Sequence, residues 1–238
     1  GNFTDADPGK TPRPEELFDL EAGYEFNSSK LNLKANLYHM YYKDQLISTG
    51  EINNVGDPVL TNVSKSYRQG IELESGIQIL NNLSCYGNIT FSRNIIPVFV
   101  DYTDNWDTWI QETDTMRNKT ISFSPSIIAC SIIDYELFQK IHFNSTTKYV
   151  GKQYVDNTQN PGRILKAYLV QNLSLSYTVK NKTFKKLMFQ FTLNNLFNKK
   201  YETNAWIYKY FEGDSLKTLD GYFPQAGINF MFRAAIMF

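Results

Sequence analysis

The chain has 238 residues, with 24 Lys and Arg against 24 Asp and Glu, and therefore no net formal charge at pH 7. This balance argues against nucleic acid as a partner, because binding phosphates requires a basic surface. No apolar run reaches the about 18–20 residues of a membrane-spanning helix, and the two Cys form neither a disulfide framework nor a metal-ligand pattern. Instead, 16 Tyr and 17 Phe are set in a polar background with a mean hydropathy of −0.39.

Alternation of apolar and polar residues with a period of two recurs along the chain, whereas helical periodicity is nearly absent. The segments LFDLEAGYEF at 17–26 and KLMFQFTLN at 186–194 both alternate in this way. Most such segments are about 10–14 residues long, which is roughly twice a usual globular strand and suits a tilted strand that crosses a membrane. We expect nine strands, at 17–26, 31–42, 67–79, 83–93, 120–135, 141–154, 167–179, 186–194 and 226–238.

The connections between these strands alternate between short and long. Short turns are expected at 27–30, 80–82, 136–140 and 180–185, and long connections at 43–66, 95–118, 155–165 and 195–224. The first of these connections can carry some strand of its own. Tight turns on one side and long loops on the other are typical of an outer-membrane β-barrel. We therefore predict an all-β fold, an antiparallel transmembrane β-barrel.

Charge and aromatic placement refine this prediction. Two aromatic rows near opposite strand ends are what a bilayer with two interfaces requires, and a soluble sandwich has no such need. Charged side chains in the middle of strands are expected to face the polar interior: Asp19, Glu21, Glu25, Lys34, Glu72, Glu74, Arg93, Lys148 and Arg233. The aromatic rows are expected at Tyr24, Phe26, Tyr135, Tyr177 and Phe238, and at Tyr38, Tyr41, Tyr67, Phe91 and Tyr149.

The strand count bears on domain organisation. If the last strand ends in the periplasm, the first strand runs inward and the segment at 1–16 is extracellular. A single-chain bacterial barrel has an even number of strands and both ends in the periplasm. Nine strands with an extracellular start therefore predict that residues 1–238 are the C-terminal part of a larger barrel.

Several stretches resemble the C-terminal barrel half of TonB-dependent outer-membrane receptors, particularly those of Bacteroidetes-type bacteria. They are RPEELFDLEAGYEF at 13–26, NVSKSYRQGIELES at 62–75, KYVGKQYVDNT at 148–158, LNNLFNKKYETNAW at 193–206 and GYFPQAGINFMFRAAIMF at 221–238. The resemblance implies a 22-stranded barrel with an N-terminal plug, of which the plug and about thirteen strands would precede this chain.

The resemblance also implies a function. The expected role is TonB-energised uptake of a scarce nutrient, an iron-siderophore or similar chelate, through the outer membrane of a Gram-negative bacterium. The expected partners are the TonB complex through the plug region, outer-membrane lipid, the barrel assembly machinery and a small extracellular ligand. Two alternatives stay open at this point: a TonB-dependent glycan importer, and a soluble secreted β-sandwich adhesion module.

Candidate ligand-binding residues are aromatic side chains of the long connections: Trp106, Trp109, Trp206, Tyr208 and Tyr210. Receptors of this kind capture ligands with aromatic and polar loop residues. Self-packing of the loops would explain the same aromatics equally well.

The end of the chain alternates down to a terminal aromatic ring. Phe230, Phe232 and Phe238 in GINFMFRAAIMF resemble the signal that the barrel assembly machinery reads in a last strand. That strand must pair with the first strand, because an open edge in lipid leaves backbone groups without hydrogen bonds.

Catalytic chemistry has no candidate residues. His39 and His142 lie on different strands without neighbouring ligand types, so we expect no enzyme activity and no cofactor. Asp101, Asp104, Asp107 and Glu112 lack the spacing of a calcium loop, so we expect no metal. Cys85 and Cys130 are expected on adjacent strands, where either a disulfide or two small wall residues is possible.

Overall fold

The computed structural model describes residues 12–52, 58–138, 140–179 and 185–238. These residues form fourteen strands and no helix. The strands are β1 (Glu16–Asn27), β2 (Leu31–Ile52), β3 (Pro58–Leu80), β4 (Leu83–Asn105), β5 (Ile110–Thr120), β6 (Ile127–Phe138), β7 (Ile141–Val150), β8 (Gln153–Tyr154), β9 (Ile164–Leu165), β10 (Tyr168–Val179), β11 (Lys186–Asn194), β12 (Glu202–Glu212), β13 (Ser215–Pro224) and β14 (Asn229–Met237).

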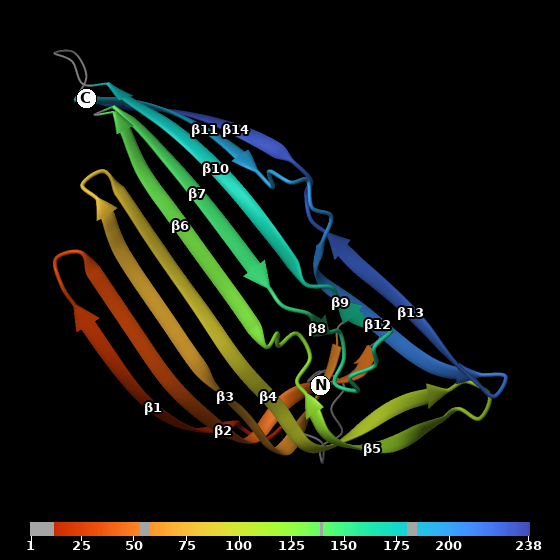
Figure 1. The fold of residues 1–238 in the computed structure, drawn as a ribbon. Coiled ribbons are helices and arrows are strands. Elements are labelled where there is room, and N and C mark those ends of the chain that lie inside the picture. The colour runs from red at the N-terminus through yellow and green to blue at the C-terminus, as the bar shows by residue number, and fades with distance from the viewer. Residues whose placement is uncertain (1–11, 53–57, 139, 180–184) are drawn as a thin grey trace.

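Nine of these strands form one continuous antiparallel sheet, in the order β1-β2-β3-β4-β6-β7-β10-β11-β14. We call this sheet the wall; in Figure 1 its strands lie side by side with a common tilt, and the C-terminus lies at the same end as the tight turns. We call that end the turn end, and the opposite end, with the longer connections, the loop end. The predicted number of wall strands is confirmed, and a single nine-stranded sheet is not the pair of packed sheets that a β-sandwich requires.

The wall hairpins are staggered. The first residue of β2 faces Ile77, and β3 runs on from there to Leu80 before it turns. The first residue of β4 faces Tyr135, and β6 runs on to Phe138. Each of these hairpins therefore reaches farther toward the turn end than the one before it, which is the stagger that tilted strands require in a barrel wall.

The register separates an apolar face from a polar face. One row joins Ala22, Leu37, Ile71, Phe91 and Ile127 across five strands. The large side chains of this face are uncovered by protein, with Leu37 54% exposed and Ile71 42% exposed. In water, each such side chain would forgo about 1.5–3 kcal/mol of burial, so this face requires an apolar solvent.

Two expectations about the faces are wrong. Arg93 faces Gln69 and lies two residues after Phe91, so the pleat places it on the apolar face and not in the polar interior. Tyr38 faces Gly70 and Glu21, and a Cβ at Gly70 would collide with its ring, so Tyr38 lies on the polar face and not in an aromatic row. In both cases strand parity, and not residue type, decides the side.

The strand boundaries differ most at the loop end. β2, β3 and β4 run well past the predicted ends of their strands, and β5, β12 and β13 occupy connections that were expected to be mainly irregular. The strand expected at 120–135 begins at Ile127, because the chain turns through 121–126 after β5. The segment at 1–11 and most of the turn at 180–185 lie outside the described residues.

Buried apolar side chains gather toward the loop end, on the loop-end parts of wall strands and in the segments beyond them. They form three clusters: Ile47, Val63, Ile96, Phe99 and Ile121; Val155, Leu165, Ala205 and Ile207; and Val150, Tyr168 and Val170. In the part of the chain that the structure describes, no helix is long and apolar enough to cross a membrane.

The two cysteines do not form a disulfide. Cys85 faces Ile133 on the apolar face, whereas Cys130 faces Asn88 on the polar face of the neighbouring strand. Because the two side chains leave the sheet on opposite sides, they cannot be bridged, and both thiols are free.

Candidate functional site

The loop end is assembled from segments that are distant in sequence. β4 continues beyond the wall and pairs with β5, and β12 pairs with β13. β12 also lies parallel to the end of β4, with Tyr210 facing Asp104 and Phe211 facing Asn105. This contact fixes the position of the β12–β13 hairpin against the β4–β5 hairpin.

Three of the five predicted aromatic residues meet where these hairpins touch. Trp106 stacks on Tyr210 with ring centroids 3.9 Å apart, and its Nε1 donates a hydrogen bond to Tyr208 Oη at 3.1 Å. Tyr208 Oη donates in turn to Asp104 Oδ2 at 2.8 Å. Trp106, Tyr208 and Tyr210 therefore form a cluster that joins the two hairpins, and part of their ring surface is used in packing.

The other two predicted residues lie apart from this cluster. Trp109 is at the tip between β4 and β5, has a positive φ of 60° and is 88% exposed. Trp206 is on β12, and its indole lies against Gly221 of β13 so closely that a Cβ there would collide with it. The five aromatics therefore do not form a single site.

A buried ion pair lies beside the aromatic cluster. Lys209 Nζ donates to Asp101 Oδ2, and the two side chains are only 4% and 9% exposed. Burial raises the pKa of the Asp101 carboxyl, and the hydrogen bond from Lys209 opposes that shift. Arg163 and Asp156 form a second shielded pair, 2.6 Å apart.

These pairs border a hollow of about 560 Å³ between β4, β5, the segment at 158–163 and β12. Asp101 faces Asp114 across the β4–β5 pair, and Glu112 follows on the same side, where it accepts a hydrogen bond from Asn105 Nδ2 at 2.6 Å. The charged residues that line the hollow are Asp101, Glu112, Asp114, Arg163 and Lys209. A surface of this kind can offer both donors and acceptors to a polar ligand.

Sequence reasoning missed Lys209 and Arg163. Lys209 stands between two predicted aromatics, Tyr208 and Tyr210, and the alternation of β12 alone indicated that it points the other way. Nothing local indicated its partner, because Asp101 lies 108 residues earlier.

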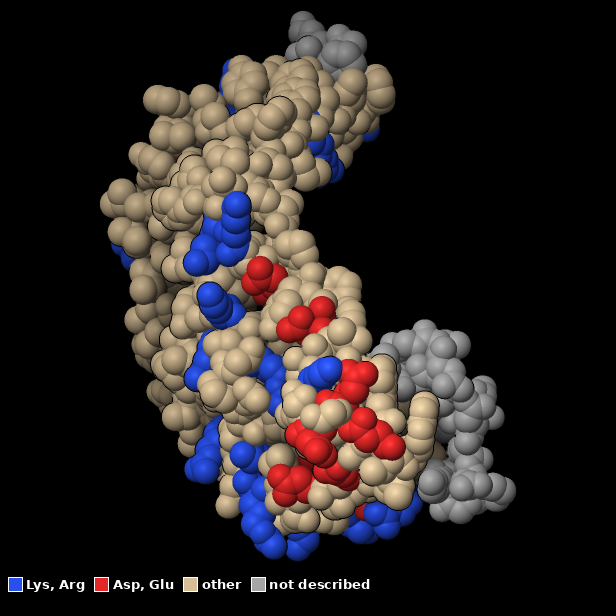
Figure 2. Space-filling view, turned by 90° about the vertical axis from the view of Figure 1, so that its right-hand side faces the viewer, with Lys and Arg blue, Asp and Glu red and all other residues tan. Residues whose placement is uncertain are grey.

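Acidic side chains gather on the loop end in Figure 2, with basic side chains beside them and along one border of the molecule. Within the described ranges, no group of three or more His, Cys, Asp or Glu is arranged to hold a metal ion.

The predicted assembly residues lie on the last wall strand and directly after it. Phe230 and Phe232 are on β14, 71% and 66% exposed, and their rings stack with Phe191 and Phe189 of β11 at 5.9 and 6.2 Å. Phe238 follows β14 directly and is 75% exposed. Phe230 and Phe232 thus continue the apolar face onto the last strand.

The sequence model of the family "TonB dependent receptor-like, beta-barrel" matches residues 3–196. The chain therefore belongs to the β-barrels of TonB-dependent receptors, which are proteins of the Gram-negative outer membrane and not enzymes. A search of curated protein sequences finds no match.

Solved structures with the same fold are larger than this chain. The ferric-catecholate import receptor Fiu from K12 E. coli is 17% identical with a TM-score of 0.64, over 97% of this chain and 29% of that one. The siderophore receptor PiuA from Acinetobacter baumannii is 16% identical with a TM-score of 0.67, over 92% and 28%. The copper transporter OprC is 18% identical with a TM-score of 0.66, over 94% and 32%. The chain thus spans less than a third of the length of each.

Proposed function

We propose that residues 1–238 are the C-terminal part of a longer receptor barrel of about 22 strands, in which a plug and earlier strands precede this segment. The chain covers only 29% and 28% of two receptors of similar fold, which supports this proposal. So does the open wall: in the described ranges, β1 and β14 are its two edges. An unpaired strand edge is costly in lipid, so further strands are needed to satisfy both.

The receptor takes up a scarce nutrient from outside the cell, and the ligand class we propose is an iron-siderophore or similar metal chelate. The observation that carries this proposal is the convergence of β4, β5 and β12 on one polar hollow beside stacked aromatic rings. Chelates of this class present both polar oxygens and flat apolar surface, which this combination of side chains can contact. Structures of similar fold are described as a ferric-catecholate import receptor, a siderophore receptor and a copper transporter.

Uptake against a gradient requires energy, which the proposal assigns to the TonB complex acting through the plug. Within this chain, the ligand contacts are assigned to the exposed loop aromatics, Trp109 and Trp206 first, with the accessible faces of Trp106, Tyr208 and Tyr210 beside them. The barrel assembly machinery is the proposed reader of Phe230, Phe232 and Phe238.

Uptake of radiolabelled iron by cells tests this function. A strain that lacks the receptor gene is complemented with the full gene, and uptake is measured for a panel of ferric chelates and for labelled oligosaccharides. The proposal expects restored uptake of at least one ferric chelate, and loss of that uptake when the TonB gene is deleted. Restored uptake of an oligosaccharide alone would overturn the chelate assignment and favour a glycan importer.

A further inference from the structure

The charges of the apolar wall face are distributed unevenly. Between the turn end and the row of Glu16, Lys43 and Lys65, its one carboxylate among the described residues is Glu16, which pairs with Lys43 at 2.9 Å. Its basic side chains all lie toward the loop end of β2, β3 and β4: His39, Lys43, Lys65 and Arg93. A face that is otherwise apolar thus ends in a cationic patch on three adjacent strands.

The depth of this patch follows from the strand lengths. Arg93 lies ten residues after the start of β4, and Gln69 eleven residues before the turn end of β3. With about 3.3 Å per residue and a tilt of about 40°, both lie about 25 Å above the turns. The apolar band of an outer-membrane barrel is about 25 Å tall, so Arg93 and Gln69 lie at its outer edge, where lipid headgroups begin.

Three of the four basic side chains at this edge, His39, Lys65 and Arg93, form no ion pair with a described carboxylate, whereas Lys43 pairs with Glu16. His39 Nδ1 and Gln69 Oε1 are 3.2 Å apart, and the His39 ring stacks on Tyr67 at 6.2 Å. Arg93 is exposed next to Gln69 in the register, and none of the described carboxylates forms an ion pair with it. Lys43 faces Lys65 directly, and like charges in that position repel; Glu16, on the other side of Lys43, offsets only one of the two charges.

Below the cationic patch the wall is hollowed. A shallow groove of about 820 Å³ runs along Leu20, Leu37, Ile71 and Phe91 and reaches His39, Gln69 and Arg93 at its upper end. A second hollow of about 760 Å³ follows on the next rows toward the turn end.

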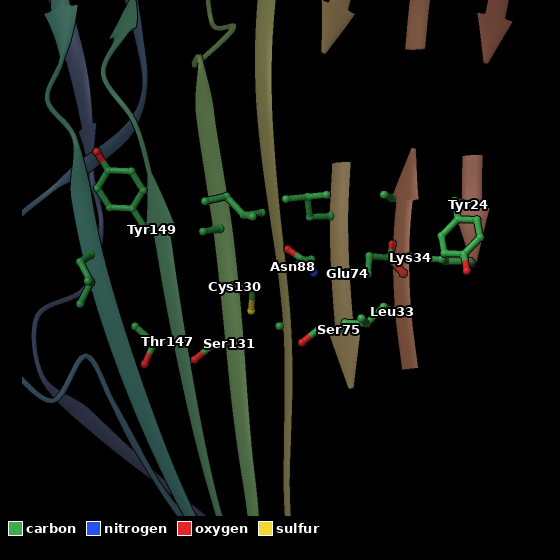
Figure 3. Close-up of a pocket in the computed structure, with 16 residues that line it drawn as sticks. Tyr24, Leu33, Lys34, Glu74, Ser75, Asn88, Cys130, Ser131, Thr147 and Tyr149 are labelled. Carbon is green, nitrogen blue, oxygen red and sulfur yellow. The ribbon is translucent and has the colours of Figure 1, made fainter. Parts of the chain in front are cut away.

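Figure 3 shows the second hollow between Tyr24 on one side and Tyr149 on the other. Several positions between these rings carry small residues, Ser75, Gly87, Ala129 and Ser131, beside the larger Leu73 and Ile89. The wall surface is therefore recessed between two aromatic rings, in the part of the barrel that meets lipid.

We propose that this face binds one phosphate-bearing lipid of the outer leaflet, with the phosphate at Arg93 and His39 and an acyl chain in the hollows below. An Arg guanidinium binds phosphate through two parallel hydrogen bonds. An acyl chain fills the apolar hollows of the wall and gains van der Waals contacts there. This inference rests on the outer-membrane location of the barrel, and not on the identity of the transported ligand. The lipid is a structural ligand, separate from the loop site.

A lipid explains the arrangement better than a protein partner would. The hollows lie within the apolar band, and the cationic patch is confined to one edge of that band. A lipid has the matching arrangement, with a charged head for the cationic patch and an apolar chain for the hollows. A soluble partner could reach only the cationic patch at the edge of the apolar band.

The test uses the full-length receptor, extracted in neutral detergent, with bound lipids counted by native mass spectrometry. Titrated probes are lipid A with two phosphates, lipid A with its phosphates removed, and phosphatidylcholine. The variants are Arg93→Gln, His39→Gln and the double variant, with Arg233→Gln as a charge-matched control on the polar face of β14. Heat modifiability on gels confirms that each variant is folded.

The expected result is one tightly retained phosphorylated lipid A, with affinity reduced about tenfold or more in the double variant and less than about twofold in Arg233→Gln. Removal of the phosphates should weaken binding to a similar degree. Equal affinity in the double variant and the parent would overturn the proposal, as would equal loss in Arg233→Gln. Displacement of the lipid by millimolar inorganic phosphate would show that the site binds a free anion, and would also overturn the proposal. Failure of the nutrient-uptake experiment would not affect this lipid-binding test.

Discussion

Tyr24 and Tyr149 lie on the same hydrogen-bonded row of the wall, with Ala35, Leu73, Ile89 and Ala129 between them. They nevertheless lie at different depths, because Tyr24 is three residues before the end of β1 and Tyr149 is eight residues after the start of β7. Five residues along a tilted strand amount to about 13 Å of depth. A row of the sheet therefore rises across the membrane, and aromatic residues near both interfaces can share one row.

This relationship predicts graded depths for probes on one row. A fluorescent label on single cysteines at 24, 73 and 149, introduced after Cys85 and Cys130 are replaced by Ser, should be quenched differently by lipids brominated at different chain positions. We expect the labels at 24 and 73 to be about equally close to the bilayer centre, on opposite sides of it, and the label at 149 to be the shallowest, because they lie three, seven and eight residues from the turn ends of their strands. Equal depths for all three labels would show that the strands are not tilted as described.

The Lys209–Asp101 pair predicts a strong asymmetry between single and double substitutions. Removal of one partner leaves a buried charge uncompensated, which costs about 3–5 kcal/mol, whereas replacing both with apolar residues of similar size is close to neutral. Asp101→Leu and Lys209→Met should each loosen the β12–β13 hairpin, and the double variant should be restored. Limited proteolysis of intact cells that display the receptor measures this loosening, with Lys217→Met, an exposed pair member, as control.

If the double variant is cleaved as fast as the single variants, the pair does not couple the two hairpins. Cleavage of Lys217→Met at the same rate would show that loss of any loop lysine has this effect.

The aromatic residues of the loops should separate into two classes. Trp106→Ala removes the stack on Tyr210 and the hydrogen bond to Tyr208, so we expect faster proteolysis of the loops together with weaker ligand binding. Trp109→Ala removes a side chain that is 88% exposed, so loop stability should not change while ligand affinity falls. Unchanged ligand affinity in Trp109→Ala would remove this residue from the proposed site.

Period-two alternation predicted the wall strands well because the apolar residues of such a strand face lipid and the polar residues face the interior. β11 was predicted with its observed bounds, and the residues of its apolar face are Leu187, Phe189, Phe191 and Leu193. β5 was not predicted, because its sequence IQETDTMRNKT is polar on both faces and is held by pairing with β4 and not by an apolar solvent. Arg93 was placed on the wrong side, since residue type was allowed to outweigh strand parity.

The loop site could be predicted only in part. Its aromatic residues stand out in composition, but the stack of Trp106 on Tyr210 and the pair of Asp101 with Lys209 join segments more than 100 residues apart. Such contacts depend on how the hairpins pack over the wall, and no local pattern encodes that arrangement. The same holds for the cationic edge of the apolar face, which becomes visible only when the register aligns β2, β3 and β4.

The last residue of the chain predicts a defect in assembly and not in ligand binding. Phe238 lies at the turn end of the wall, opposite the loop end that carries the hollow, and its ring contributes about 1.5–3 kcal/mol of burial at most. Phe238→Ser should lower the amount of receptor in outer-membrane fractions, while ligand binding per assembled molecule stays normal. Phe197→Ser serves as control, because Phe197 is also exposed, at 64%, but lies outside the wall strands. Normal abundance with lost binding would contradict the assignment of Phe238 to assembly.

The measurement that tests the central claim most directly is the accessibility of nitroxide labels placed one at a time along β11 in the receptor reconstituted into lipid. Power saturation measures how accessible each label is to oxygen, which concentrates in lipid, and to a nickel complex, which stays in water. Labels at 187, 189, 191 and 193 should be accessible to oxygen, and labels at 188, 190, 192 and 194 to nickel, because successive side chains of a wall strand alternate between lipid and the polar interior. Nickel accessibility at 189 and 191, or protection of these two positions from both reagents, would contradict the account, because it would place the apolar face in water or inside a closed protein core.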